Sequence, residues 1–419
     1  MTNIAAPRAP TSPFWIVVLL ATAVLINYVD RGSLGLAVPL IKAEFHLGDQ
    51  SLGWLLSAFS FTYVLAMAPV GWLADRYGAH RVLAGGLAIW SVATLLTGFA
   101  AGLIPLLLLR LLLGVGESSA FPCSSKLIAG QVTAAKIGLA NGVLAFGYLV
   151  GPAIGTWAGG HIMDAHGWRP VFWLFGGLSL LWLVPWSRVH VREQVTAPAA
   201  TVVADPAAEV PTIRQILRQP GLWGASLGHF TSNYTYYFIL NWLPDYLVES
   251  RGYSLSRMAD VVGSGYLINA ASALFMGWAT DRWIRSGRST DFIYKATMGV
   301  AHLGTIACMA GIVLLSEQQS IWCLYTYLVL MGLSSPGVFA IPQILAGPAA
   351  AGRWVGIQNT CGNVAGIVAP AATGILLAMS GRSFTSAFAL AGIVNLLGFV
   401  GWVIILPKIA PIRWNRTEA

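Results

Sequence analysis

Charged side chains are scarce in this sequence of 419 residues. Asp, Glu, Lys and Arg make up 10 % of it, against about 25 % in an average soluble domain. Hydrophobic residues make up 56 %, and the mean hydropathy is +0.70. So few charges cannot cover a water-exposed surface, which excludes a soluble enzyme, and so much apolar content excludes an intrinsically disordered chain.

Cysteine is also rare, and motifs for enzymatic chemistry are missing. The four cysteines lie in apolar stretches without a C-x-x-C pair, so we predict neither a disulfide framework nor a metal site. No nucleotide-binding signature and no converging nucleophile, base or metal cluster occurs. We therefore expect no cofactor and predict that the protein is neither an ATP-driven pump nor an enzyme.

Long apolar runs dominate the chain, and a bilayer core needs about 20 apolar residues per helix. The first run continues through Asp30 and Arg31 without a small-residue cleavage site, which argues against a signal peptide. We predict an all-α integral membrane protein with twelve transmembrane helices, at about residues 14–40, 51–73, 82–100, 103–125, 138–160, 170–188, 221–247, 259–280, 292–315, 320–346, 355–379 and 385–406.

The positions of Lys and Arg predict the orientation. Seventeen of the 24 fall in loops on one side and five on the other, which places both termini in the cytoplasm. The net charge of +8 is explained in this way and does not indicate a nucleic-acid partner. The longest polar gap predicts two six-helix bundles, 1–188 and 221–419, joined by a cytoplasmic linker, 189–220. Its middle, Ala197 to Pro211, favours a flexible spacer, and a short amphipathic helix is expected from Thr212 to Gln219.

The two predicted bundles carry matching signatures. Gly71–Arg76 and Gly277–Arg282 both read G-W-x-x-D-R, after the second and the eighth span. Residues 138–152 and 356–370 both read G-x-x-N followed by a proline, 14 residues after the glycine. Internal repeats of this kind are typical of secondary transporters, whose substrate site lies between the halves at the bilayer midplane.

Residues 71–81, GWLADRYGAHR, resemble the cytoplasmic loop signature of the major facilitator superfamily, G-x-L-x-D-R-x-G-x-x-R. The resemblance implies the fold of that superfamily and transport by alternating access. Acids and arginines in these loops can bridge helix ends and hold one closed state, although a static contact is the alternative. The predicted gating residues are Asp75, Arg76, Arg81, Asp281 and Arg282.

Four segments resemble the anion:cation symporter family, which includes bacterial galactonate, hexuronate and glucarate transporters and animal sialin. They are residues 27–31 (NYVDR), 110–122, 238–247 (FILNWLPDYL) and 359–370. The resemblance implies that Arg31 binds the anionic group of the substrate. It also implies that Asp30 and Glu117 carry protons, with Arg110 as a companion arginine near Asp30.

The residues themselves favour the same roles. Asp30, Arg31, Arg110 and Glu117 lie inside predicted spans, where each costs about 2.5–3.5 kcal/mol at a helix centre. A guanidinium in a low-dielectric site suits bidentate capture of a carboxylate, and Arg31 shares a helix face with Tyr28. The alternative, ion pairs that only fix helix packing, such as Asp30 with Arg110, stays open.

The seventh span carries a polar stripe. Tyr234, Tyr237 and Asn241 fall on one helical face, where hydroxyls and an amide suit a polyhydroxylated substrate. Interfacial aromatic residues are the alternative. The predicted substrate-binding residues are Arg31, Tyr28, Tyr63, Tyr148, Tyr234, Tyr237, Asn241, Ser335, Asn359 and Asn363.

These features predict a proton-coupled symporter that imports a small organic anion across a bacterial inner membrane and works as a monomer. Sugar acids are the first expectation, but Gly147 and Ser335 stand where sugar-acid members often have glutamine and tryptophan. Aromatic or aliphatic carboxylates are therefore the second. The alternatives on the same fold are proton-driven export and anion exchange. The glycines of residues 147–155 resemble the antiporter signature of drug exporters, but close helix packing through small residues is the favoured explanation for them.

Overall fold

The computed structural model describes residues 11–132, 137–191 and 211–414, and all regular elements in these ranges are helices. The first group is α1 (Pro13–Phe45), α2 (Asp49–Tyr77), α3 (Ala79–Thr97), α4 (Leu103–Glu117), α5 (Ala120–Gln131), α6 (Ile137–His166), α7 (Arg169–Leu181) and α8 (Leu183–Ser187). The second group is α9 (Ile213–Leu217), α10 (Pro220–Asp245), η2 (Tyr246–Ser250), α11 (Leu255–Arg285), α12 (Thr290–Leu314), α13 (Glu317–Asn363), α14 (Ala365–Met379), α15 (Phe384–Phe399) and η3 (Val400–Ile405).

Within the described ranges, eleven helical segments are long and apolar enough to cross a membrane. The prediction of an all-helical membrane fold is confirmed. α10 has the length of a span but is not among the eleven, because residues such as His229, Asn233 and Asn241 lower its mean hydropathy. Most of α10 is buried by other helices, so its polar side chains need not face lipid.

α13 contains the predicted span 320–346 and the first part of the next predicted span, 355–379. At Gly347 the backbone has φ 67° and ψ 175°, so the chain turns there and returns toward α14. A positive φ is easily adopted by glycine, which has no Cβ. The short helix expected after the linker is confirmed as α9, where Thr212 and Gln215 form a capping box. Residues 192–210, which include most of the predicted flexible spacer, lie outside the described residues.

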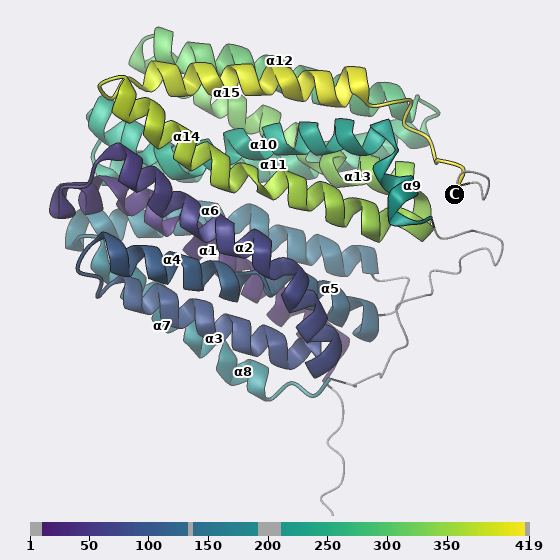
Figure 1. Cartoon of the computed structure of the whole chain (residues 1–419), viewed down its shortest axis with the longest axis horizontal. Helices are drawn as coiled ribbons and strands as arrows, with labels where there is room; N and C mark the ends of the chain where they lie inside the picture. The colour runs from purple at the N-terminus through teal and green to yellow at the C-terminus, as the bar shows by residue number, and fades with distance from the viewer. Residues whose placement is uncertain (1–10, 133–136, 192–210, 415–419) are drawn as a thin grey trace, which may run out of the picture.

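The helices gather in two groups that lie one above the other in Figure 1. We call α1–α8 the first half and α10–η3 the second half. In the first half α1 packs on α6, α2 on α4 and α3 on α7, and in the second half α10 and α11 pack on α13 and α12 on α15. The long helices run lengthwise through the bundle, so one end carries the C-terminus and the other carries Arg382. We call these the C-terminal end and the Arg382 end.

The main contacts between the two halves lie near the Arg382 end and join α1 with α10, α2 with α14 and α6 with α11. Glycines permit the close approach. A Cβ at Gly35 would lie 2.6 Å from the Leu240 carbonyl oxygen, and one at Gly53 would lie 2.8 Å from the Pro370 carbonyl oxygen. We call this interface between the halves the seam. Ser57 adds a hydrogen bond across it, from its Oγ to the Ile367 carbonyl at 2.8 Å. The halves are therefore closed against each other at the Arg382 end.

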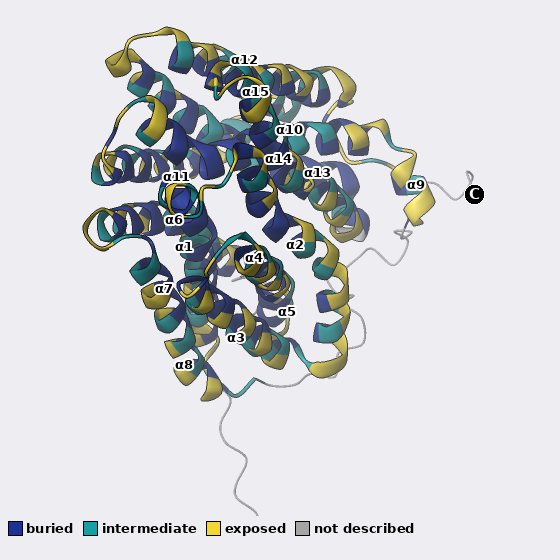
Figure 2. Ribbon diagram, turned by 60° about the vertical axis from the view of Figure 1, so that its left-hand side comes forward, coloured by how far each residue is buried: buried dark blue, intermediate teal, exposed yellow. Residues whose placement is uncertain are grey.

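Figure 2 shows exposed positions on the outer faces of the helices. Many of the exposed residues are large and apolar. Leu139, Leu314 and Met379 are 71–80 % exposed. A water-soluble monomer rarely exposes apolar surface so widely, whereas lipid tails cover it without cost. Polar and ionisable side chains are instead buried between the helices, and they build the site.

Candidate functional site

A buried ion pair joins α1 and α4. Arg31 donates from Nη2 and Nε to the same oxygen, Oε2 of Glu117, at 3.1 and 3.2 Å. Both side chains are at most 5 % exposed. Asn27, one turn before Arg31, accepts a further bond from Nη2 at 3.2 Å. The other oxygen of Glu117, Oε1, has no hydrogen-bond partner among the described residues.

Close helix packing brings Glu117 to this position. Gly114 lies against the backbone of α2 at Phe59. Gly116 lies against α3, where an added Cβ would lie 2.7 Å from the backbone nitrogen of Trp90. The missing side chains let α4 approach both helices. The carboxyl group at the end of α4 is thereby held over α1.

Aromatic rings surround the Arg31 guanidinium. The Tyr28 ring centroid lies 4.7 Å from its Cζ, the Tyr63 centroid 4.8 Å and the Phe59 centroid 5.1 Å. Tyr148 of α6 packs on Tyr28 with 5.9 Å between the ring centroids. Ring faces attract a cation, so these contacts offset part of the cost of burying the guanidinium. The predicted residues Tyr28, Tyr63 and Tyr148 therefore lie together with Arg31.

Asp30 and Arg110 do not join this ion pair directly. Asp30 turns away from Arg31, as expected for neighbours on a helix, and accepts a bond from Ser179 Oγ of α7 at 3.3 Å. Arg110 also lies over the Phe59 ring, with 5.1 Å from Cζ to the ring centroid. Among the described residues Asp30 has no ion pair, and neither Asp30 Oδ1 nor Arg110 Nε has a hydrogen-bond partner. The possible Asp30–Arg110 bridge is absent from this conformation.

The second half contributes one part of the predicted polar stripe. Tyr237 of α10 lies next to Arg31 and donates its hydroxyl to Asn363 Oδ1 at 3.3 Å. Asn363 in turn donates to Asn359 Oδ1 at 3.1 Å. Asn241 is tied to its own helix, donating to the Tyr237 carbonyl at 2.8 Å. Tyr237, Asn363 and Asn359 thus form a polar chain that leads from Arg31 into the second half.

Among the described residues, two further predicted site residues form no hydrogen bond with Tyr237, Asn363 or Asn359. Tyr234 is buried, and its hydroxyl has no hydrogen-bond partner among the described residues. Ser335 is half-buried in α13. Their assignment to substrate binding stays a prediction.

The predicted gating loops lie at the C-terminal end. Lys126 of α5 donates to Asp75 Oδ1 at 2.6 Å and to the Ala74 carbonyl at 2.9 Å, which ties α5 to α2 inside the first half. Arg76 lies over the Trp72 ring, 5.3 Å from its centroid. In the matching loop of the second half Arg282 lies over Trp278 at 5.9 Å. The G-W-x-x-D-R signature that the two halves share therefore forms the same arginine–tryptophan contact in each half.

Sequence reasoning missed a second cluster of charges at the Arg382 end. Arg382, in the turn between α14 and α15, donates to Asp49 of α2 at 3.1 Å and to Asp245 of α10 at 2.7 Å. Lys42 of α1 also reaches Asp49, at 2.8 Å. The sequence did contain one signal for this cluster. Asp245 is an acidic residue near the end of a predicted span, within residues 238–247.

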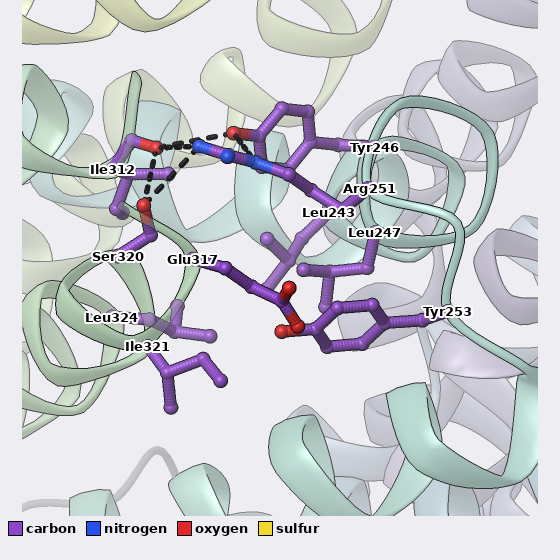
Figure 3. Close-up of a pocket in the computed structure, with 10 residues that line it drawn as sticks. All are labelled: Leu243, Tyr246, Leu247, Arg251, Tyr253, Ile312, Glu317, Ser320, Ile321 and Leu324. Atoms are coloured by element: carbon purple, nitrogen blue, oxygen red, sulfur yellow. Dashed lines mark hydrogen bonds between the residues drawn. The ribbon is translucent and has the colours of Figure 1, made fainter. Parts of the chain in front are cut away.

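A small pocket at the same end contains none of the predicted site residues (Figure 3). Arg251 fills one side of it and donates to the Ile312 carbonyl at 2.6 Å and to the Tyr246 hydroxyl at 2.7 Å. The Ile312 carbonyl lies in the last turn of α12, where carbonyls lack partners within the helix. Arg251 therefore acts as a helix cap, and the pocket is part of the scaffold.

Comparison with known proteins identifies the family. The sequence model of the Major Facilitator Superfamily matches residues 20–370. The chain belongs to the Major Facilitator Superfamily. It is a transporter and not an enzyme, as the sequence predicted.

Similar proteins agree with this assignment over nearly the whole chain. A D-galactonate transporter of Escherichia coli is 27 % identical over 93 % of this chain and 94 % of its own length. A probable sulfoacetate transporter of Cupriavidus necator is 29 % identical over 91 % of both chains. The inward-open structure of the xylose transporter XylE from E. coli shares the fold, with a TM-score of 0.75, 14 % identity and coverage of 97 % and 98 %. The predicted resemblance to anion transporters of this superfamily is confirmed.

Proposed function

We propose that this chain is a proton-coupled symporter that imports a small organic carboxylate. The observation that carries the proposal is the buried Arg31–Glu117 ion pair. The guanidinium of Arg31 can bind an anionic substrate, and the carboxylate that pairs with it can take up a proton. Relatives named as galactonate and sulfoacetate transporters support an anionic substrate. Arg31 is the buried cation best placed to meet that anion, because the polar chain of the second half begins beside it.

The geometry supports a competition for Arg31. Both arginine donors go to Glu117 Oε2, and Oε1 is left open. A proton added at Oε1 neutralises the carboxylate and weakens its hold on the guanidinium. The carboxylate of the substrate can then accept the two donors that Glu117 accepts in the empty protein, in the bidentate geometry that arginine favours.

The same competition prevents a proton leak. After the substrate leaves, Arg31 needs a new anionic partner, because an unpaired buried charge is costly. Glu117 meets that need by releasing its proton and pairing again. Asp30, buried beside Ser179, is the second proton carrier in this scheme.

Electrical energy favours coupling. A monovalent anion that enters a negatively charged cytoplasm works against about 2.3 kcal/mol per 100 mV. One proton cancels that charge, and two protons make import electrogenic and favourable. We place both termini in the cytoplasm and the Arg382 end outside, in a bacterial inner membrane, with the monomer as the working unit.

Two substrate classes fit different parts of the site. The polar chain of Tyr237, Asn363 and Asn359 suits the hydroxyls of a sugar acid, which is the first candidate. The rings of Tyr28, Phe59 and Tyr63 around Arg31 favour a flat apolar body beside the carboxylate, as in an aromatic acid. Both classes belong in the test.

The test uses protein reconstituted in liposomes that contain a pH dye and have a negative interior. Aldonates, uronates and aromatic carboxylates are added outside, and tracer uptake is followed in parallel. We expect the transported anion to acidify the interior. In Glu117→Gln we expect tracer exchange to continue while acidification is lost.

The matched control is Glu44→Gln. Glu44 is also paired with an arginine, Arg169 at 2.7 Å, but the two side chains are 39 % and 33 % exposed. Glu44 lies near the end of α1, several turns after Arg31. Liposomes that contain the Glu44→Gln protein should acidify as those with the wild type do. Acidification in Glu117→Gln at the wild-type rate would overturn the role of Glu117, and uptake without acidification in the wild type would overturn proton coupling itself.

A further inference from the structure

The charges at the Arg382 end form a row of alternating sign. Lys42 contacts Asp49, Asp49 contacts Arg382, and Arg382 contacts Asp245, at 2.8, 3.1 and 2.7 Å. The acids are the more deeply buried members, with Asp49 8 % and Asp245 0 % exposed. Lys42 and Arg382 are 19 % and 28 % exposed.

Only the middle link joins the two halves. Lys42 and Asp49 belong to α1 and α2 of the first half, whereas Arg382 and Asp245 belong to the second half. When the halves part, each charge keeps an oppositely charged partner on its own side. Opening therefore leaves no buried charge unpaired, which would otherwise be a heavy cost.

The backbone of Arg382 places its side chain for this contact. Gly381 and Arg382 have φ of 62° and 67°, and left-handed backbone is uncommon for a residue with a side chain. Arg382 N donates to the Leu377 carbonyl at 2.8 Å, which closes the last turn of α14. A tight reversal immediately after α14 thus projects the guanidinium toward α2 and α10.

We infer that Lys42, Asp49, Arg382 and Asp245 form a balanced latch, in which the Asp49–Arg382 contact closes the Arg382 end and the outer two charges weaken it. This inference rests on alternating access in the transporter family and not on the identity of the anion. Like charges lie close together across the closed seam, because Lys42 and Arg382 share Asp49 Oδ1 and because Asp49 and Asp245 share the Arg382 guanidinium. These two repulsions oppose the central attraction, so the seam closes without locking.

The latch predicts that neutralising different members of the row shifts the Arg382 end in opposite directions. Neutralising an inner member removes the attraction and should open the end. Neutralising an outer member removes a repulsion and should close it further. A simple structural cluster would lose stability in every variant and would show no such reversal.

The experiment measures the distance between two spin labels at the Arg382 end in substrate-free protein. Ala101 and Gln318 are exposed positions at this end, one in each half, and can be replaced by cysteine after the four native cysteines are changed to alanine. We expect Asp49→Asn to increase the long-distance population about threefold to tenfold. Lys42→Gln and Asp245→Asn should decrease that population.

To make both directions visible, the same variants are also made in Gly53→Ala protein, whose added methyl group loosens the closed seam. The matched control is Glu249→Gln, an exposed acid near Asp245 that lies outside the row and should leave the distances unchanged. The latch would be overturned if the long-distance population shifted in the same direction in Asp49→Asn and Lys42→Gln, or if it shifted in neither variant. If Asp245→Asn does not fold, Lys42→Gln tests the same sign at a partly exposed position. Because no substrate is present, the result is independent of the proposed carboxylate import.

Discussion

Arg31 and Arg382 each hold carboxylates, but the partner of Arg31 lies in the same half, whereas Arg382 also reaches Asp49 in the other half. A pair within one half moves as a unit when the halves rock. A pair between the halves must break and form again in every transport cycle. We therefore propose that the same chemistry serves substrate binding at Arg31 and gating at Arg382.

Burial follows this difference. The Arg31–Glu117 pair is almost completely removed from solvent and is supported by Asn27 and by three rings. Arg382 is more than one-quarter exposed, so water can replace Asp49 as the seam opens. A contact that must be broken repeatedly is best placed where the separated charges can be hydrated.

The largest effect is expected for Arg31→Gln. The change leaves Glu117 buried and unpaired, which costs about 3–5 kcal/mol of folding stability unless the carboxyl takes up a proton. We expect loss of anion uptake and a lower melting temperature of the purified protein, measured by thermal unfolding and tracer uptake.

The double variant Arg31→Gln/Glu117→Gln is the control for this prediction. It removes both charges and should recover most of the melting temperature, but no transport. A single variant as stable as the wild type would show that the pair is not as strongly coupled as its burial indicates.

A smaller effect, and one that separates the two regions, is expected from two glycine substitutions. Gly114→Ala forces a methyl group against the Phe59 carbonyl inside the first half and should lower folding stability by about 1–3 kcal/mol. Gly53→Ala forces it against the Pro370 carbonyl of the other half, 2.8 Å away. The halves can move apart there, so we expect an open Arg382 end with little loss of stability.

Thermal unfolding and the Ala101–Gln318 distance, measured on both proteins, distinguish the two outcomes. The comparison fails if Gly53→Ala unfolds as easily as Gly114→Ala, or if Gly114→Ala opens the end without loss of stability.

The sequence was sufficient to predict the helical membrane fold and the residues at its centre. Apolar runs predicted the spans, and the rarity of buried charge singled out Asp30, Arg31, Arg110 and Glu117. The helical period correctly turned Asp30 away from Arg31. These are local properties, which depend on composition and on 3.6 residues per turn.

The pairing of these charges could not be predicted. Arg31 and Glu117 are 86 residues apart, and their contact depends on how closely α4 packs on α2 and α3. The Arg382 cluster was harder still, because it joins α1, α2, α10 and the turn after α14. In the sequence Lys42 and Arg382 were only two of the five basic residues on the less basic side.

The smallest effect is expected at a third contact between the halves. His161 of α6 lies 3.5 Å from Asp260 of α11, near the same end as the latch. Both side chains are more than one-third exposed, at 39 % and 58 %, and exposed pairs contribute about 0–1 kcal/mol. We expect His161→Gln to change the Ala101–Gln318 distance distribution less than twofold, against the larger shift in Asp49→Asn. Equal shifts in the two variants would mean that crossing the seam is sufficient for gating, whereas the expected difference would assign gating to the buried carboxylates that Arg382 holds.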